Sequence, residues 1–239
     1  MKRILFQICL CCCAVITNAQ KQFVVDPNVA ARSVNGSFNS ITVLGGIDLY
    51  LSQSDKDEIA ISASEDKYKE GIKTVVENST LRIYYDGEKN WSKGNRKLRA
   101  YVSFKDLVKL EASGASDIIV AGEIKVPSLL LKLSGASDFK GSVSVSSLTL
   151  ELSGASDVSI KGTASIVNIE SSGASDVKAY DLSADICTAK ASGASDVNIT
   201  VNKEMTAHAS GASDIYFKGN AVIKDQHSTG ASSVVRKNR

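Results

Sequence analysis

The sequence predicts an all-β fold: a single-stranded parallel β-helix, or β-solenoid, of about 19 residues per coil. The first observation behind this prediction is a pentapeptide, Ser-Gly-Ala-Ser-Asp, whose copies start 21, 19, 19, 20 and 18 residues apart. A decayed copy, Thr-Gly-Ala-Ser-Ser, follows after 19 more residues. A fixed period of this length is typical of solenoids, in which each repeat stacks on the next. The copies start at Ser113, Ser134, Ser153, Ser172, Ser192, Ser210 and Thr229.

The second observation is that apolar residues alternate with polar ones on both sides of the pentapeptide. Leu129, Leu131 and Leu133 precede one copy, and Phe139 and Val158 follow the Asp of later copies. Alternation with a period of two indicates strands with one buried face. Two short strands per repeat leave no room for a crossover helix, so parallel coils must stack directly, and we expect a right-handed coil.

The third observation is the composition of the pentapeptide itself. Glycine and the small Ala and Ser suit a corner where the backbone turns sharply and a larger side chain would clash with the next coil. We therefore predict that the pentapeptide is a structural corner. Changes in repeat length are then expected in loops opposite the corners, such as Glu123–Ser128 and Ser142–Ser147.

Residues 1–19 are predicted to be a secretory signal peptide. Lys2 and Arg3 precede an apolar run from Ile4 to Ile16, and a small-residue exit ends at Ala19. The run is shorter than the roughly 18 to 20 apolar residues that span a bilayer, so no transmembrane segment is expected. We expect an exported protein that is periplasmic, outer-membrane-associated or extracellular.

Cleavage after residue 19 would change both the cysteine content and the charge. Cys187 would remain as the one cysteine, so no internal disulfide could form. The formal charge would fall from +2 to 0, because Lys2 and Arg3 are removed without any acid. A neutral chain without a basic stripe is a poor ligand for nucleic acid or an anionic membrane, and we exclude both partners.

The mature chain divides into three predicted regions. Residues 20–35 form an N-terminal linker or first strand, and residues 36–107 form an N-terminal β region of the solenoid. In that region Gly45–Tyr50 resembles a degenerate corner, and Ser64–Gly71 is predicted to be a short helix with Ser64 as its N-cap. Residues 108–239 form the repeat β-helix with a polar C-terminal cap. Strands are expected at Glu58–Ala63, Lys73–Glu77, Thr80–Tyr85 and Leu98–Phe104.

Stacked coils should align the aspartates of the pentapeptides in one column. Carboxylates about 4.8 Å apart repel each other, so the column needs hydrogen-bond donors or cations. We expect each Asp to accept hydrogen bonds from the N–H groups and serine hydroxyls of its own corner. The alternative is a row of Ca²⁺ or other cations. The column comprises Asp117, Asp138, Asp157, Asp176, Asp196 and Asp214.

His208 and His227 each lie two residues before a pentapeptide copy, one coil apart. They belong to a column that we expect to point outward, with Glu–Lys pairs between coils. Two adjacent imidazoles are weak candidates for a Zn²⁺ or Ni²⁺ site, because no third ligand is evident in the sequence. We therefore predict no metal and no cofactor. The full column is Glu111, Lys132, Glu151, Glu170, Lys190, His208 and His227.

The loop at residues 86–97 contains the single tryptophan, Trp91, beside Lys93 and Arg96. An exposed Trp among basic residues suits a recognition tip, although an ordinary polar hairpin loop is the simpler interpretation.

Catalytic patterns are missing. The chain has no Gly-x-Ser-x-Gly elbow, and Cys187 falls on an inward apolar position away from both histidines. We therefore expect no enzyme activity.

The repeated Ser-Gly-Ala-Ser-Asp-Val corners, the Gly-Gly-Ile-Asp-Leu segment at residues 45–49 and the signal peptide together resemble one known family. It is called "putative auto-transporter adhesin, head GIN domain", and the resemblance spans residues 34–235. It implies an exported β-helical domain of the bacterial cell envelope, with no established ligand.

The combined prediction is an exported, non-enzymatic binding or structural module of the cell envelope, adhesin-like, with a protein or glycan partner. Two alternatives remain open. One is a polysaccharide-active enzyme or lectin that uses the aspartate column, with or without Ca²⁺. The other is a purely structural spacer. Open sheet ends also make an oligomer conceivable.

Overall fold

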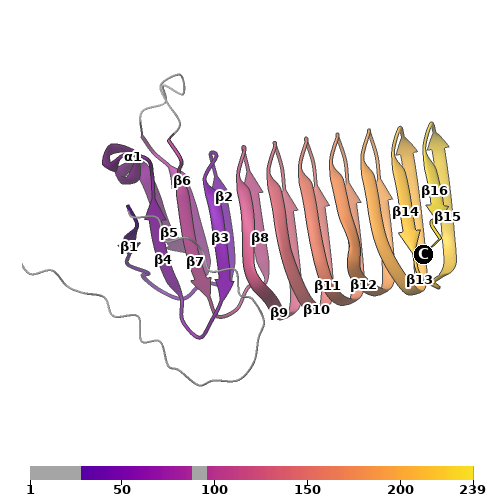
Figure 1. Ribbon diagram of the computed structural model, residues 1–239, viewed down its shortest axis with the longest axis horizontal. Coiled ribbons are helices and arrows are strands. Elements are labelled where there is room, and N and C mark those ends of the chain that lie inside the picture. Colours follow the sequence, from indigo (N-terminus) through magenta and orange to yellow (C-terminus); the bar gives the residue numbers. More distant parts are fainter. Residues whose placement is uncertain (1–27, 88–95, 239) are drawn as a thin grey trace, which may run out of the picture.

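The structure, a computed structural model, describes residues 28–87 and 96–238. These residues form a row of stacked coils whose tight turns align along one edge (Figure 1). The described strands belong to a single hydrogen-bonded sheet system, parallel throughout the repeat region. The expected β-solenoid is therefore confirmed. The predicted signal peptide lies outside the described residues.

Each repeat is one long strand that runs from the Asp of one corner almost to the next corner. Neighbouring coils pair in parallel, with Phe139 opposite Val158 and Leu150 opposite Ile169. The two short strands expected per repeat are thus one continuous strand, which bends opposite the corner. These strands are β9 (Asp117–Leu133), β10 (Asp138–Leu152), β11 (Asp157–Ser171), β12 (Asp176–Ala191) and β13 (Asp196–Gly211).

Differences in repeat length are taken up within these strands rather than in loops. The pairing register of β10 with β9 shifts between Lys140 and Ser142, and that of β12 with β13 shifts between Ala179 and Ser183. An extra residue in a parallel pair is accommodated by such a bulge, which bends the strand locally. The segments predicted as loops, 123–128 and 142–147, therefore lie inside β9 and β10.

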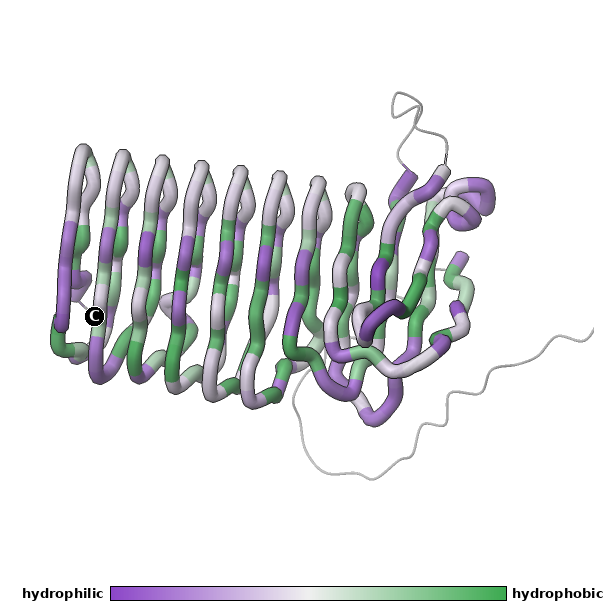
Figure 2. The backbone as a smooth tube through the Cα atoms, turned by 180° about the vertical axis from the view of Figure 1, so that it is seen from behind, coloured by the Kyte–Doolittle hydropathy of each residue, from purple (hydrophilic) through white to green (hydrophobic). Residues whose placement is uncertain are grey.

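The core follows the alternation seen in the sequence. Leu131, Leu150, Ile169 and Ala189 occupy successive levels of one inward column, and each is at most 1% exposed. Figure 2 shows the apolar and polar residues alternating along every coil, with the aligned tight turns of intermediate hydropathy. Burial of this continuous apolar column provides most of the driving force for stacking.

The corners stack through their backbones. Gly154 has a φ of +83°, and the N–H of Ala155 donates to the carbonyl of Gly135 over 2.7 Å. A Cβ on Gly154 would lie 2.5 Å from that carbonyl oxygen, so a side chain does not fit. The pentapeptide is therefore a structural corner, as its composition predicted.

The N-terminal region contains both the first coil of the solenoid and a cover for its end. The first coil consists of β2 (Ser40–Leu44) and β3 (Asp48–Gln53), joined by Gly45 and Gly46 at φ +85° and +76°. On one side it pairs with β8 (Lys109–Ser113) and β9, and on the other with β6 (Thr80–Tyr85) and β7 (Arg99–Phe104). The antiparallel strands β1 (Ala30–Arg32), β4 (Glu58–Ser62) and β5 (Ile72–Glu77) close this end.

The short helix α1 spans Asp66–Gly71, but Ser64 is not its N-cap. Glu65 occupies that position in extended conformation, without a side-chain capping bond. The backbone N–H of Ser64 instead donates to the carbonyl of Arg96 over 2.8 Å. This bond ties Ser64 to the chain that leads into β7, one residue before the helix cap.

The C-terminal end is open. The last strands are β14 (Asp214–Lys218), β15 (Val222–Gly230) and β16 (Ser233–Arg236). Every residue of β15 is exposed, and among the described strands it pairs with β13 alone. Gln226 and Ser228 of β15 stand opposite the buried Ala207 and Ala209, so the last coil is polar where earlier coils are apolar.

Candidate functional site

The predicted column of aspartates is present. Asp117 pairs with Asp138, Asp157 with Asp176, and Asp196 with Asp214 in the registers of neighbouring coils. The column continues into the N-terminal region through Asp48, whose carboxylate accepts a hydrogen bond from the backbone of Asp117. Sequence analysis placed Asp48 in a degenerate corner but did not count it as a member of the column.

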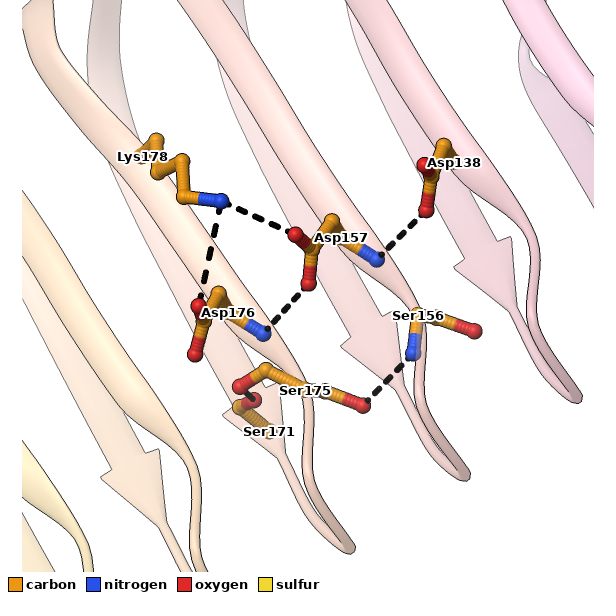
Figure 3. Close-up of polar contacts among 7 residues, drawn as sticks. All are labelled: Asp138, Ser156, Asp157, Ser171, Ser175, Asp176 and Lys178. Atoms are coloured by element: carbon orange, nitrogen blue, oxygen red, sulfur yellow. Dashed lines mark hydrogen bonds and ion pairs between the residues drawn. The ribbon is translucent and has the colours of Figure 1, made fainter.

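The donors to these carboxylates come from the next coil rather than from the same corner. The N–H of Asp157 donates to Oδ1 of Asp138, and the N–H of Asp176 to Oδ1 of Asp157, both over 3.3 Å (Figure 3). Asp214 donates to Asp196 in the same way. The expectation of bonds within one corner is therefore wrong for these residues, because the stacked neighbour brings its N–H closer.

The serines before the aspartates form a second ladder that runs in the opposite direction. The N–H of Ser156 donates to Oγ of Ser175 in the following coil over 3.2 Å (Figure 3). The N–H of Ser195 likewise donates to Oγ of Ser213 over 3.3 Å. These serines are fully buried. Their hydroxyls point into the solenoid and contribute to coil stacking rather than to an exposed ligand site.

A lysine offsets part of the charge in the middle of the column. Nζ of Lys178 lies 2.9 Å from Oδ2 of Asp157 and 3.8 Å from Oδ2 of Asp176 (Figure 3). The hydrogen bond to Asp157 raises the pKa of Lys178. A pocket of about 280 Å³ beside the column is lined by Asp117, Asp138, Asp157, Lys140 and Lys178, among others. This pocket therefore contains both negatively charged aspartates and positively charged lysines.

The two ends of the column differ electrostatically. Burial and the neighbouring charge of Asp117 raise the pKa of Asp48. Hydrogen bonds from the hydroxyls of Ser233 and Tyr216 lower the pKa of Asp214. The Tyr216 contact had no direct signal in the sequence. It joins Asp214 to the residue two positions later, on the same face of the strand.

The column that contains the histidines points outward, as expected. Lys132 pairs with Glu151 over 3.0 Å and Lys190 with Glu170 over 3.1 Å, so opposite charges meet between coils. We call this set of outward residues, from Glu111 to His227, the charged column. Each exposed pair is worth only about 0 to 1 kcal/mol, but together they fix the positions of long side chains.

A groove of about 540 Å³ runs beside the charged column and crosses several coils. We call it the charged groove. It is lined by the charged column from Lys132 to His227 and by the hydroxyls of the corners next to it, in a regular polar arrangement. Those hydroxyl residues are Ser153, Ser172, Ser192, Ser210 and Thr229.

The two histidines lie close together at the C-terminal end of the charged groove. The ring centroids of His208 and His227 are 6.4 Å apart, and Nε2 of His208 is 2.9 Å from Oδ2 of Asp225. Asp225 was missed in the sequence because its counterparts in earlier coils include Leu130 and Thr149. Within residues 28–87 and 96–238, no group of three His, Cys, Asp or Glu side chains is placed to hold a metal ion.

The predicted recognition loop is corrected in part. Arg96 is only 8% exposed, and its guanidinium lies 5.3 Å from the Tyr68 ring and 5.1 Å from the Tyr85 ring. It therefore packs within the N-terminal cover, where contact with two aromatic rings stabilises the cation, rather than at an exposed tip. Trp91 and Lys93 lie outside the described residues.

Cys187 lies on the inward face of β12. It is completely buried, and burial raises the pKa of its thiol to about 12. A thiol in this state is a weak nucleophile and a poor metal ligand. Its role in the described fold is that of a small apolar side chain.

The comparisons with known proteins agree with this architecture. A crystal structure from Bacteroides fragilis, described as a "putative adhesin", has a TM-score of 0.80 and 21% identity, covering 89% of this chain and 98% of that one. A "putative lipid binding protein" from Parabacteroides distasonis has a TM-score of 0.64 and 20% identity over the same shares. A "putative adhesin" from Parabacteroides merdae has a TM-score of 0.61 and 17% identity, again over 89% and 98%. At these identities the likeness establishes a common fold.

Two further comparisons concern the family of this chain. No curated protein matches the chain. In the described part of the chain, no helix has the length and apolar character that a membrane crossing requires. A family model matches residues 37–221, which include the N-terminal coils and nearly all the repeats. The chain therefore belongs to the family described as "Putative auto-transporter adhesin, head GIN domain".

Proposed function

We propose that this protein is an exported, non-enzymatic binding module of the bacterial cell envelope, which holds an extended polar partner, a glycan or a protein segment, in the charged groove. The observation that carries the proposal is the groove itself, about 540 Å³ in volume and continuous over several coils. An elongated groove on a rigid solenoid suits an elongated partner, because the partner can repeat the same contacts from coil to coil.

The chemistry of the groove supports a polar partner of low net charge. Lys132, Glu151, Glu170 and Lys190 neutralise one another in pairs, and serine hydroxyls line the groove beside them. Side chains held in position lose less conformational freedom when a partner binds. Export and location at the envelope are supported by the charged and apolar pattern of residues 1–19 and by the family.

The proposed module is also non-enzymatic. In the middle of the aspartate column, the carboxylates of Asp138 and Asp157 each accept a backbone N–H from the next coil, and Lys178 holds Asp157 in an ion pair. Carboxylates engaged in this way support the fold. A lectin or polysaccharide-active enzyme at this column is the second candidate, favoured by the adjacent pocket of about 280 Å³.

The test is a glycan array together with capture from an envelope extract, using the wild type and two matched variants. Ser192→Tyr places a ring in the charged groove, whereas Ser165→Tyr places the same ring at an exposed position outside the groove lining. We expect Ser192→Tyr to lose the partner and Ser165→Tyr to retain it. Equal binding by both variants would move the site elsewhere on the protein. If neither the array nor the extract yields a partner, the alternative of a purely structural spacer would be favoured.

The second candidate makes a separate prediction. Turnover of an acidic polysaccharide, abolished by Asp157→Ala or Asp176→Ala with the fold intact, would replace the binding module with an enzyme. Binding of such a polysaccharide without turnover, lost in the same variants, would establish a lectin at the aspartate column.

A further inference from the structure

We propose that His208, Asp225 and His227 form a surface site for a divalent transition-metal ion, Zn²⁺ or Cu²⁺, which joins the last two levels of the solenoid. The three side chains come from β13 and β15, at the open end of the stack (Figure 1). The two histidines also line the C-terminal end of the charged groove, and the proposal requires no partner in that groove.

The strand register places the three residues on one face. His208 pairs with His227, and Thr206 pairs with Asp225, so Asp225 lies diagonally across from His208. The residue between Thr206 and His208 is the buried Ala207, so both neighbours of Ala207 point outward. Adjacent strands are about 4.8 Å apart, and positions i and i+2 of one strand are about 6.6 Å apart. Among the described residues no three such side chains are placed to hold an ion, so these side chains must rotate to bring three donor atoms to about 2.0 to 2.2 Å from one ion.

The side chains already approach one another without the ion. Nε2 of His208 and Oδ2 of Asp225 are 2.9 Å apart, and the rings of His208 and His227 are 6.4 Å apart at an angle of 74°. The His208 side chain is 42% exposed and that of Asp225 65%, so both can rotate. Rotation of these side chains would replace the direct His208–Asp225 contact with two metal bonds, and His227 would supply the third.

The donor set suits a metal of this class. Two imidazole nitrogens and one carboxylate oxygen are common ligands of Zn²⁺, with water as the fourth, and Cu²⁺ binds such N/O sites more tightly. The neighbouring ammonium groups are held elsewhere, since Lys190 pairs with Glu170 over 3.1 Å and Lys224 with Glu204 over 3.3 Å. A cation at the site would therefore be bound by the negative carboxylate of Asp225 and by one nitrogen lone pair from each of the two imidazoles.

Binding would stabilise the end of the solenoid. All of β15 is exposed, and its pairing partner within the described part of the chain is β13. An ion with ligands on both strands binds the stacked state more tightly than the opened state, so it shifts the equilibrium towards stacking. We therefore expect metal to slow amide hydrogen exchange in β15 and to leave the exchange of β10 unchanged.

The experiment is calorimetric titration of the metal-free, reduced full chain with Zn²⁺ and, separately, Cu²⁺, followed by hydrogen exchange. Because the thiols of Cys9, Cys11, Cys12 and Cys13 can bind Zn²⁺ and can reduce Cu²⁺, the site is read as the difference between the wild type and the variants. We expect one equivalent of ion to be lost, or its affinity to fall at least about tenfold, in His208→Gln and in His227→Gln. Asp225→Asn should weaken the same ion, and Asp185→Asn, an acid outside the site, should not.

The proposal is overturned if the wild type and the histidine variants bind the same number of ions with the same affinity. It is also overturned if metal protects β10 and β15 equally. The His227 side chain is exposed on β15 and lies edge-on to the His208 ring, so His227→Gln should fold even if His208→Gln does not. Electron paramagnetic resonance of the Cu²⁺ form gives a further readout, with coupling to two nitrogens in the wild type and one in His227→Gln.

Discussion

The Asp157 carboxylate accepts the backbone N–H of Asp176 over 3.3 Å, so two adjacent acids of one column are joined by a hydrogen bond. The same relation recurs between Asp138 and Asp157 and between Asp196 and Asp214. A column of carboxylates can therefore persist without a cation on every level, because backbone donors of the next coil compensate part of the charge. This relationship leads to the first prediction.

Asp157→Ala should lower the free energy of unfolding by about 0.5 to 2 kcal/mol, because the N–H of Asp176 loses its acceptor. Asp157→Asn keeps an acceptor oxygen and should cost less than half as much. The exposed pair with Lys178 should contribute less than about 1 kcal/mol of either loss. Urea unfolding measures the difference.

Thermal unfolding with added Ca²⁺ or a chelator tests the calcium alternative. If the column works through hydrogen bonds, neither Ca²⁺ nor a chelator shifts the midpoint of thermal unfolding of the wild type. A chelator-induced fall of several degrees that is absent in Asp157→Ala would show instead that the column holds cations.

Gly173→Ala should destabilise the protein by more than about 3 kcal/mol, because two penalties combine. Gly173 has a φ of +81°, and a Cβ there would lie 2.4 Å from the carbonyl oxygen of Gly154. Gly45→Ala is the matched control, since Gly45 has a φ of +85° but open space around the added Cβ. The control should cost only about 1 to 2 kcal/mol. Equal costs in chemical unfolding would show that stacking at the corner is looser than described.

Asp48 and Asp214 should respond to pH with opposite signs. The pKa of Asp214 is lowered by the hydroxyls of Ser233 and Tyr216, so its stabilisation is present above the unfolded pKa and is lost as pH falls through the lower folded pKa. The pKa of Asp48 is raised by burial and by Asp117, so ionised Asp48 opposes folding at neutral pH. Unfolding measured between acidic and neutral pH should show Asp214→Asn destabilised and Asp48→Asn stabilised at pH 7.

In both variants the difference from wild type should shrink towards the acidic end of that range. For Asp48→Asn it should vanish below the unfolded pKa of Asp, and for Asp214→Asn below the lowered folded pKa. Effects of the same sign in the two variants would contradict the described environments.

Cys187 should resist thiol reagents in the folded protein. It is fully buried, and its thiol pKa of about 12 leaves almost no thiolate at pH 8. Labelling at this residue, followed by mass spectrometry of the resulting peptides, should therefore report opening of β12 and accelerate sharply in denaturant. Rapid labelling of Cys187 under native conditions would mean that the middle of the solenoid opens readily.

Much of the fold could be predicted from the sequence, because aligning the copies of the pentapeptide shows which residues of neighbouring coils are paired. Comparing copies identified the inward Leu131 and Leu150, the outward Lys132 and Glu151, and the corner glycines. The donors to the aspartate carboxylates could not be predicted from the sequence. The donor N–H can lie in the same coil or in the next one. Residue spacing along the chain does not distinguish these cases.

Outside the repeats, prediction from the sequence was weaker. Arg96 looked like part of an exposed basic loop, yet it packs near Tyr68 and Tyr85, which are distant along the chain. Asp225 has no acidic counterpart in the earlier coils that pair at its level, so comparison of repeats hid its proximity to His208. Such contacts depend on tertiary packing and on the particular side chains of the last coil.

The backbone contacts at the corners have a consequence for how this protein can evolve. The N–H of Ala155 bonds to Gly135 as that of Ala174 bonds to Gly154, whereas Leu130, Thr149 and Asn168 share one outward column. Gain or loss of one repeat in the gene would therefore leave compatible corners on both sides of the junction. Each added repeat would lengthen the protein by about 4.8 Å and add one row to each surface. Length and surface chemistry can thus diverge separately between relatives, with the two ends unchanged.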